Sequence, residues 1–102
     1  MTIKDIQDKI IREDYQLSEH AVKRMIFRSI NRHEIEESIL NGEIIEDYPD
    51  DKYSPSCLVY GKTQSGRDLH IQISFPPNVV IITTYDPDPE EWVNCKIRRN
   101  SK

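Results

Sequence analysis

The chain has 102 residues, of which 36% are hydrophobic and 31% are charged, which suits one domain over residues 1–102 with one core. No apolar run approaches the roughly 20 residues of a membrane-spanning helix, and the acidic start does not fit a signal peptide, so we expect no membrane contact and a cytoplasmic location. The formal net charge of −4 argues against a generic nucleic-acid binder, for which a clearly basic domain is expected.

The charges are unevenly distributed along the chain. Acidic residues gather between positions 43 and 51 and again between 86 and 91. Such a division allows one side of the molecule to meet an anion and another to meet a cation. Basic residues gather in one early stretch and in the tail: His20, Lys23, Arg24, Arg28, Arg32, His33, Lys96, Arg98, Arg99 and Lys102.

Three helices are predicted in the first part of the chain. Thr2 can cap a first helix within residues 1–14, in which isoleucines recur at helical spacing. Ser18 can cap a second helix. Asn31 at the cap and Glu34 three residues later form a capping-box pattern for a third helix, which the pair Asn41-Gly42 ends.

After Gly42 the pattern changes to that of four strands: E-I-I-E-D-Y, C-L-V-Y-G-K-T, D-L-H-I-Q-I-S-F and V-V-I-I-T-T-Y-D. In the third, Leu69, Ile71 and Ile73 alternate with polar residues, so one face is expected in the core and the other in water. The short turns favour antiparallel neighbours. The sequence therefore predicts an α+β domain, with N-terminal helices packed on one face of a four-stranded antiparallel sheet and the other face partly open.

The end of the chain and its metal-binding potential are less informative. Residues 90–102 read as a short helix or ragged tail, with Trp92 docked on the core. The distant Cys57 and Cys95 suggest neither a zinc site nor a disulfide, so we expect reduced thiols. No metal or cofactor motif is present, so neither is expected. The alternative is magnesium held by Asp50 and Asp51 together with Asp86 or Asp88.

A set of basic and aromatic residues suits RNA cleavage without a metal ion. A base removes the 2′-hydroxyl proton, an acid protonates the leaving oxygen, and arginines hold the phosphate. Plainer interpretations exist: the helix arginines can border a solvated face, and the histidines can be an ordinary strand residue and a residue packed near a cap. The candidate residues are His20, Arg24, Arg28, Arg67, His70 and Tyr85.

The motifs L-S-E-H-A-V-K-R-M-I-F-R-S-I, N-G-E-I-I-E-D-Y-P-D-D, S-C-L-V-Y-G-K-T, G-R-D-L-H and I-I-T-T-Y-D-P-D closely resemble a bacterial family called domain of unknown function 4258. The likeness runs from about Tyr15 to Trp92 and leaves residues 93–102 as a tail. More distantly, the order of motifs resembles the BrnT and RelE toxin class. That resemblance implies a compact, metal-free ribonuclease with a small antitoxin partner. Tyr85 stands where BrnT-like toxins tend to carry arginine.

The sequence thus leads to two hypotheses about function. The first is a metal-independent endoribonuclease of the toxin type, in which His20 and His70 transfer protons, Tyr85 supports them and the arginines bind phosphate. Its partners are RNA and a small antitoxin protein. The alternative is a noncatalytic module that binds a protein or a nucleic acid, in which the acidic loop with Tyr48 and Tyr53 matters most.

Overall fold

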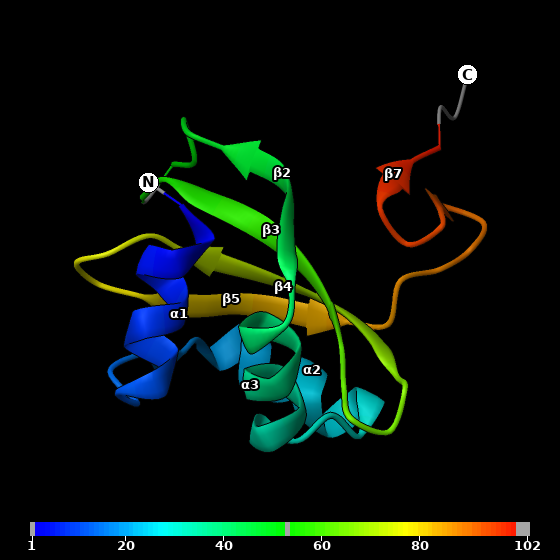
Figure 1. The fold of residues 1–102 in the computed structure, drawn as a ribbon, viewed down its shortest axis with the longest axis horizontal. Helices are drawn as coiled ribbons and strands as arrows, with labels where there is room; N and C mark the ends of the chain where they lie inside the picture. The colour runs from blue at the N-terminus through cyan, green and yellow to red at the C-terminus, as the bar shows by residue number, and fades with distance from the viewer. Residues whose placement is uncertain (1, 53, 100–102) are drawn as a thin grey trace.

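A computed structural model describes residues 2–52 and 54–99 and gives an α+β fold (Figure 1). Within these residues the chain forms three helices, a five-stranded mixed sheet and a separate two-stranded hairpin. Tyr53 and Lys102 lie outside the described residues. The elements are α1 (Ile3–Ile11), β1 (Gln16–Leu17), α2 (Glu19–Arg28), α3 (Arg32–Leu40), β2 (Glu43–Tyr48), β3 (Ser56–Lys62), β4 (Asp68–Ser74), β5 (Val80–Tyr85), β6 (Trp92–Val93) and β7 (Ile97–Arg98).

The main sheet has the strand order β1-β5-β4-β3-β2. Strands β2 to β5 form the predicted antiparallel meander, and β1 adds a fifth strand that runs parallel to β5. The backbone N–H groups of Gln16 and Ser18 donate to the carbonyls of Val79 and Ile81, each at 3.0 Å. The prediction of a four-stranded, wholly antiparallel sheet is therefore wrong, because a strand of two residues is too short to show alternation.

The helix boundaries follow from the predicted caps. The Ser18 side chain accepts a hydrogen bond from the Ala21 amide at 2.9 Å. At α3 the Asn31 side chain accepts from the Glu34 amide at 2.8 Å, and the Glu34 carboxylate accepts from the Asn31 amide at 3.0 Å. This capping box is confirmed. Among the described residues, no helix has the length and apolar character that a membrane crossing requires.

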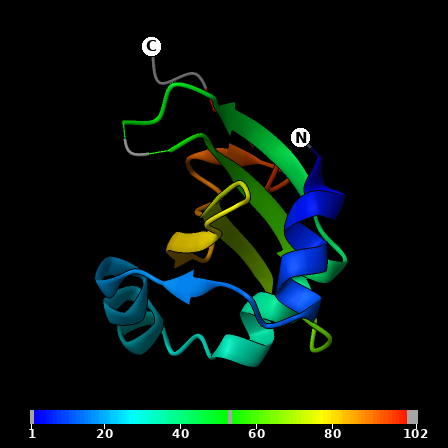
Figure 2. The ribbon, with the colours of Figure 1, turned by 90° about the vertical axis from the view of Figure 1, so that its left-hand side faces the viewer.

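The core lies between one face of the sheet and the helices. Leu69, Ile71 and Ile73 of β4 are fully buried against it, as their alternation predicted. Figure 2 shows the sheet curving around the C-terminal hairpin, with α1 on the outer side. The core residues supplied by α1 and α3 are Ile6, Ile10, Ile35 and Ile39.

The C-terminal segment folds as a hairpin, not as the predicted helix or ragged tail. Asn94 and Cys95 adopt positive φ angles of 53° and 64°, and the Lys96 amide closes the turn onto the Val93 carbonyl at 3.0 Å. Trp92 is only 2% exposed, so its predicted docking is confirmed. Cys95 and Cys57 are both free thiols. The hairpin covers part of the sheet face that was expected to be open.

Candidate functional site

Helix α2 lies along β5 and is fixed to it at both ends. At the start, the Ser18 hydroxyl donates to the Ile82 carbonyl at 2.8 Å. At the end, the guanidinium of Arg67 binds the carbonyl of Arg28 at 2.8 Å and the carboxylate of Asp86, which follows β5. The helix therefore runs beside β5 from Ile82 towards the end of that strand.

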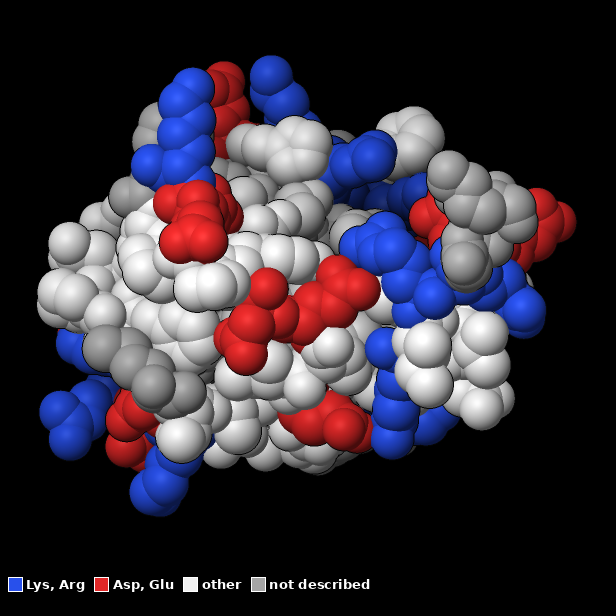
Figure 3. All heavy atoms as spheres, turned by 90° about the horizontal axis from the view of Figure 1, so that it is seen from above, with Lys and Arg blue, Asp and Glu red and all other residues white. Residues whose placement is uncertain are grey.

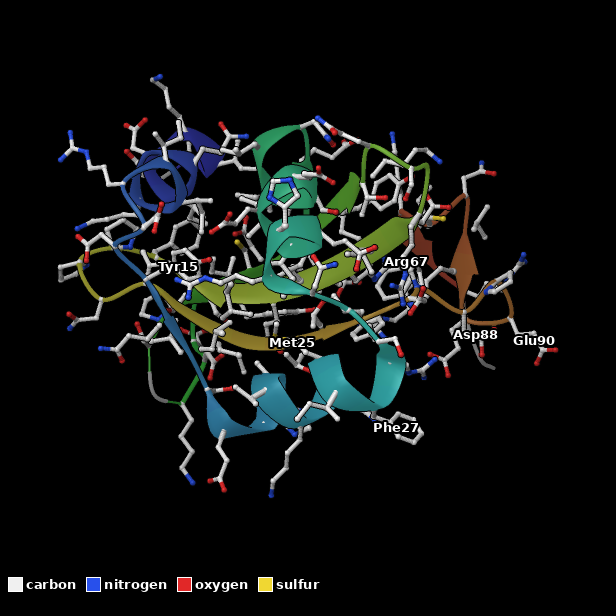
Figure 4. The ribbon with its side chains drawn as sticks, turned by 90° about the horizontal axis from the view of Figure 1, so that it is seen from below. Tyr15, Met25, Phe27, Arg67, Asp88 and Glu90 are labelled. Atoms are coloured by element: carbon white, nitrogen blue, oxygen red, sulfur yellow. The ribbon has the colours of Figure 1, made fainter. Side chains whose placement is uncertain are left out.

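One side of α2 carries His20, Arg24, Phe27 and Arg28, which we call the α2 cluster. A step of 100° per residue spreads these side chains over about 100° of the helix surface, next to the side from which Ala21 and Met25 pack on the core. Figure 4 shows Met25 directed at the sheet and Phe27 directed outwards. His20 and Arg28 are exposed, and Arg24 is half-buried.

The aromatic ring of the α2 cluster has two cations near it. Phe27 is 73% exposed, although large apolar side chains are usually buried. The Cζ atoms of Arg24 and Arg28 are 6.0 and 5.8 Å from the ring centroid, within the range of cation–π contacts. The Nε of Arg24 is buried and lacks a hydrogen-bond partner among the described residues. The α2 cluster therefore offers positive charge and a stacking surface together.

A groove of about 650 Å³ begins at the first turn of α2. His20 and Asp51, the latter from the loop between β2 and β3, are among the residues that line it. Asp51 accepts a hydrogen bond from Ser56 at 2.6 Å and one from Gln72 at 3.3 Å, so the loop is held to the sheet. The groove thus contains one imidazole and one carboxylate. Its lining residues are Ser18, His20, Asp51, Ser54, Gln72, Ser74, Asn78, Val80 and Ile82.

His70 points away from the core, as alternation predicted, but it is 0% exposed instead of lying in water. The predicted exposure is wrong because the hairpin covers this part of the sheet. His70 Nε2 donates to the Cys95 carbonyl at 2.6 Å, which leaves Nδ1 unprotonated and 3.3 Å from the Tyr85 hydroxyl. Burial lowers the pKa of His70, since a charged imidazole loses its hydration there.

Aromatic rings surround the buried imidazole. The centroid of the Trp92 ring lies 4.5 Å from that of His70, and the two rings meet edge to face. The ring centroids of Tyr85 and Tyr60 lie 5.3 and 6.0 Å from that of His70. Such edge-to-face pairs are favourable beyond the area they bury. Burial also raises the pKa of Tyr85. His70 and Tyr85 are therefore brought together, as expected, but under a cover.

Arg67 was predicted to bind phosphate, and every N–H of its guanidinium already has a protein acceptor. Its Nε and one amino group bind Asp86 at 2.9 and 3.0 Å, and further N–H groups meet the carbonyls of Arg28 and Ser29 and the Glu34 carboxylate. Figure 4 shows Arg67 beside the end of α2. Arg67 holds the last turn of α2 against the residue that follows β5.

The predicted site residues thus fall into three groups. His20, Arg24 and Arg28 lie on α2, His70 and Tyr85 lie under the hairpin, and Arg67 joins α2 to Asp86. Sequence reasoning missed two residues. Phe27 is an apolar residue on the basic side of an amphipathic helix, and that mismatch was a usable signal. Asp51 was considered only as a magnesium ligand, and in the described part of the chain no group of three or more possible ligands could hold a metal ion.

The alternative hypothesis concerned the acidic loop after β2, and it is the acidic residues of β2 itself that the chain's own hairpin engages. Lys96 pairs with Glu43 at 2.9 Å, and Arg98 makes two contacts with Glu46 at 3.0 and 3.2 Å. The Tyr48 hydroxyl donates a hydrogen bond to the Glu46 carboxylate. Figure 3 shows acidic side chains across the middle of this face and basic ones at its right-hand end.

The chain was compared with protein families, curated proteins and solved structures. The model of a family described as Domain of unknown function (DUF4258) matches residues 17–86. Neither the curated proteins nor the solved structures contain a match. The matched segment runs from the end of β1 to the residue after β5 and so includes α2 and all the residues that line the groove.

Proposed function

The chain belongs to the DUF4258 family, whose description assigns no activity, and from its own surface we propose that it is a metal-independent endoribonuclease domain that binds single-stranded RNA along α2. The observation that carries this proposal is the α2 cluster, with its exposed ring near two guanidinium groups and a groove that begins at His20. The distant resemblance of the motifs to BrnT and RelE toxins points to the same chemistry, as an analogy of fold.

Binding rests on two complementary interactions. The guanidinium groups of Arg24 and Arg28 suit phosphate oxygens, with which they form charge-assisted hydrogen bonds. The exposed ring of Phe27 offers a face on which an unpaired base can stack, and such stacking tolerates any base. A local concentration of this kind can bind RNA although the whole chain is negative, because salt screens charges beyond about 8–10 Å.

Cleavage would use the two ionisable groups of the groove. The 2′-oxygen of a ribose attacks the adjacent phosphorus and its proton passes to the Asp51 carboxylate. The bond from phosphorus to the 5′-oxygen breaks, and that oxygen takes a proton from the His20 imidazolium. The products are a 2′,3′-cyclic phosphate and a 5′-hydroxyl. This assignment replaces His70 with Asp51, because His70 is covered and both its ring nitrogens face protein groups.

The test is cleavage of a labelled single-stranded RNA by the purified chain in EDTA. We expect products that end in 2′,3′-cyclic phosphate, and His20→Ala or Asp51→Asn to lower the rate by factors of about 100 to 10,000. His33→Ala is the matched control, because His33 is exposed on α3 and pairs only with Glu37 among the described residues. Arg24→Gln and Arg28→Gln should weaken binding, with Arg12→Gln on α1 as their control. The proposal would be refuted if the RNA stayed intact and bound the unaltered chain no more tightly than it binds the Arg24→Gln variant.

A second candidate function is the binding of a small protein partner, such as an antitoxin. It is favoured by an apolar stripe on α2, on the other side of the core-facing residues from the α2 cluster, since Val22 and Ile26 are 39% and 75% exposed. Exposed apolar side chains that adjoin one another often mark protein interfaces. The test is binding of the small protein encoded by an adjacent reading frame, where one exists. Ile26→Glu should abolish that binding, and Ile11→Glu on α1, where the side chain is 67% exposed, should not.

A further inference from the structure

The C-terminal hairpin is attached to the domain without a shared backbone ladder. Among the described residues, β6 and β7 pair only with each other and form a sheet of their own. The Arg99 amide donates to the Glu91 carbonyl at 2.8 Å and closes the base of the hairpin. Because no main-chain ladder joins it to β2 or β3, side-chain contacts and one bond to a carbonyl hold the hairpin in place.

These attachments are few and of two kinds. The ion pairs of Arg98 with Glu46 and of Lys96 with Glu43 are partly exposed, and pairs of that kind contribute about 0–1 kcal/mol. The more buried contacts are the bond from His70 to the Cys95 carbonyl, the packing of Trp92 on the imidazole and the interactions of the Cys95 side chain with Tyr60 and Asp68. The hairpin therefore sits on the main sheet through side-chain contacts and one bond to a carbonyl, with no backbone ladder between the two sheets among the described residues.

The surface beneath the hairpin is a row of aromatic rings across three strands. Tyr60 of β3 lies opposite His70 of β4, and His70 lies opposite Tyr85 of β5. Two positions further along β4, on the same face, Gln72 lines the groove. The covered row thus continues the open groove along one face of the sheet.

Charge on the two sides of this row would orient a bound strand. The α2 cluster lies on the β5 side, because α2 runs beside β5 and its last turn is tied to Asp86. Glu43 and Glu46 lie on the β2 side. Phosphates would therefore turn towards α2, and bases with amino groups that donate hydrogen bonds would turn towards β2.

We propose that the hairpin is an intrachain cover on a base-stacking surface formed by Tyr60, His70 and Tyr85, for which Trp92 and the bases of single-stranded RNA compete. The indole of Trp92 occupies the position on His70 that a base takes when the hairpin leaves. This inference rests on the proposed binding of RNA and extends it to a second surface. The hairpin follows the segment that matches the family, so the cover is an addition to the family core.

Two readouts on the full chain separate binding from uncovering. The anisotropy of a fluorescein-labelled, mixed-sequence RNA of about 12 nucleotides, a length within the range of known single-strand sites, measures binding. The emission of Trp92, the single tryptophan of the sequence, measures uncovering when it is excited at a wavelength that RNA does not absorb. Because Trp92 is buried, its release shifts the emission to longer wavelength.

Arg98→Glu is the variant that opens the cover, because it replaces the pair with Glu46 by a repulsion. Arg99→Glu makes the same change of charge one residue later, where the side chain donates only to the Pro89 carbonyl among the described residues. Adding Glu46→Arg to Arg98→Glu restores an ion pair of reversed sense and should close the cover again.

We expect RNA to shift the emission of Trp92 in the unaltered chain as the anisotropy saturates. Arg98→Glu should show the shifted emission without RNA and bind RNA about 10-fold more tightly if the cover is closed in about 90% of molecules. Arg99→Glu and the reversed pair should behave like the unaltered chain.

Other outcomes would overturn one idea or both. RNA that binds without any change in Trp92 emission, and equally to the variants at 98 and 99, would overturn the cover and leave the proposed function standing. RNA bound only by Arg98→Glu would support the cover and contradict binding along α2 in the closed chain. If neither the unaltered chain nor Arg98→Glu bound RNA, both the cover and the proposed function would be overturned. An opened chain that binds a peptide of residues 91–99 but not RNA would show that the aromatic row takes a basic peptide instead.

Discussion

Gly61 of β3 passes so close to Ser38 of α3 that a Cβ atom on the glycine would lie 1.8 Å from the Ser38 carbonyl oxygen. Backbone meets backbone at this point, and no side chain can rotate away. The approach presses α3 onto the sheet directly above Val59 and Leu69, which are fully buried.

Gly61→Ala should therefore be strongly destabilising, by about 3 kcal/mol or more, because the helix must move away from the sheet and leave the core loosely packed. Urea denaturation followed by circular dichroism measures the loss. Gly66→Ala is the matched control: its φ is +91° but a Cβ there meets nothing within 4 Å, so only conformational strain of about 1 kcal/mol is expected. Equal losses for the two variants would contradict the close-contact explanation.

The capping box of α3 gives a second prediction. Asn31→Ala removes the acceptor of the Glu34 amide and should lower the free energy of unfolding by about 1 kcal/mol. Asn31→Asp keeps an acceptor at the helix N-terminus, so its stability should stay near that of the unaltered chain. An alanine variant as stable as the aspartate variant in urea would mean that the cap contributes nothing.

Arg67 should be needed for stability whether or not the chain binds RNA. Arg67→Lys keeps the charge but loses the bidentate hydrogen bonds to Asp86 and the hydrogen bonds to the end of α2. We therefore expect the free energy of unfolding to fall by about 1.5–3 kcal/mol. Thermal unfolding measures it, with Arg12→Lys as the control on an exposed arginine. If Arg67→Lys kept full stability and lost only RNA binding, the structural role assigned to Arg67 would be wrong.

The burial of His70 predicts that the free energy of unfolding decreases as the pH is lowered. Its pKa is lowered in the folded chain, so the unfolded chain, with a pKa of about 6.5, takes up the proton first as pH falls. The contribution of His70 to the free energy of unfolding is therefore fully present above about pH 7. It is lost as the pH falls towards the pKa of His70 in the folded chain, by up to about 1.4 kcal/mol per pH unit. Glu46, Asp68 and Arg98 are the charged groups that act on the imidazole.

Urea titrations between about pH 5.5 and 7.5 test this prediction, since carboxylates with ordinary pKa values near 4 stay ionised there. His70→Gln removes the titrating group and should be less stable at pH 7.5, but it should show a flatter pH dependence. An equal slope in the two proteins would assign the pH dependence to other groups. His20→Gln serves as the comparison for an exposed histidine.

The secondary structure could largely be predicted from sequence, because its signals are local. Asn31 with Glu34, and Leu69 with its alternating neighbours, carry the information within a few residues. Alternation also told which face of the sheet His70 occupies. It could not tell whether that face was covered, since the cover comes from two-residue strands around Trp92 and Ile97 that show no periodicity.

The roles of individual side chains were harder to predict because they depend on distant partners. An arginine that binds phosphate and an arginine that holds a helix end have the same local sequence signal. Arg67 reaches the carbonyl of Arg28, 39 residues earlier, and only the fold brings the two together. The same holds for Asp51, which entered the site through a loop whose course the sequence did not specify.

The short parallel strand β1 has a consequence for how the chain is made. Gln16 and Leu17 pair with Val80 and Ile81, so the link between α1 and α2 has no sheet partner until β5 has left the ribosome. Closing so large a loop is slow, because its entropy is lost before the contacts form. During translation, the segment that joins the N-terminal helices therefore cannot dock on the sheet until β5, the last long strand, has emerged. A nascent chain stalled ahead of residue 80 should be cut by proteases near Gln16, and one stalled after β5 is exposed should resist.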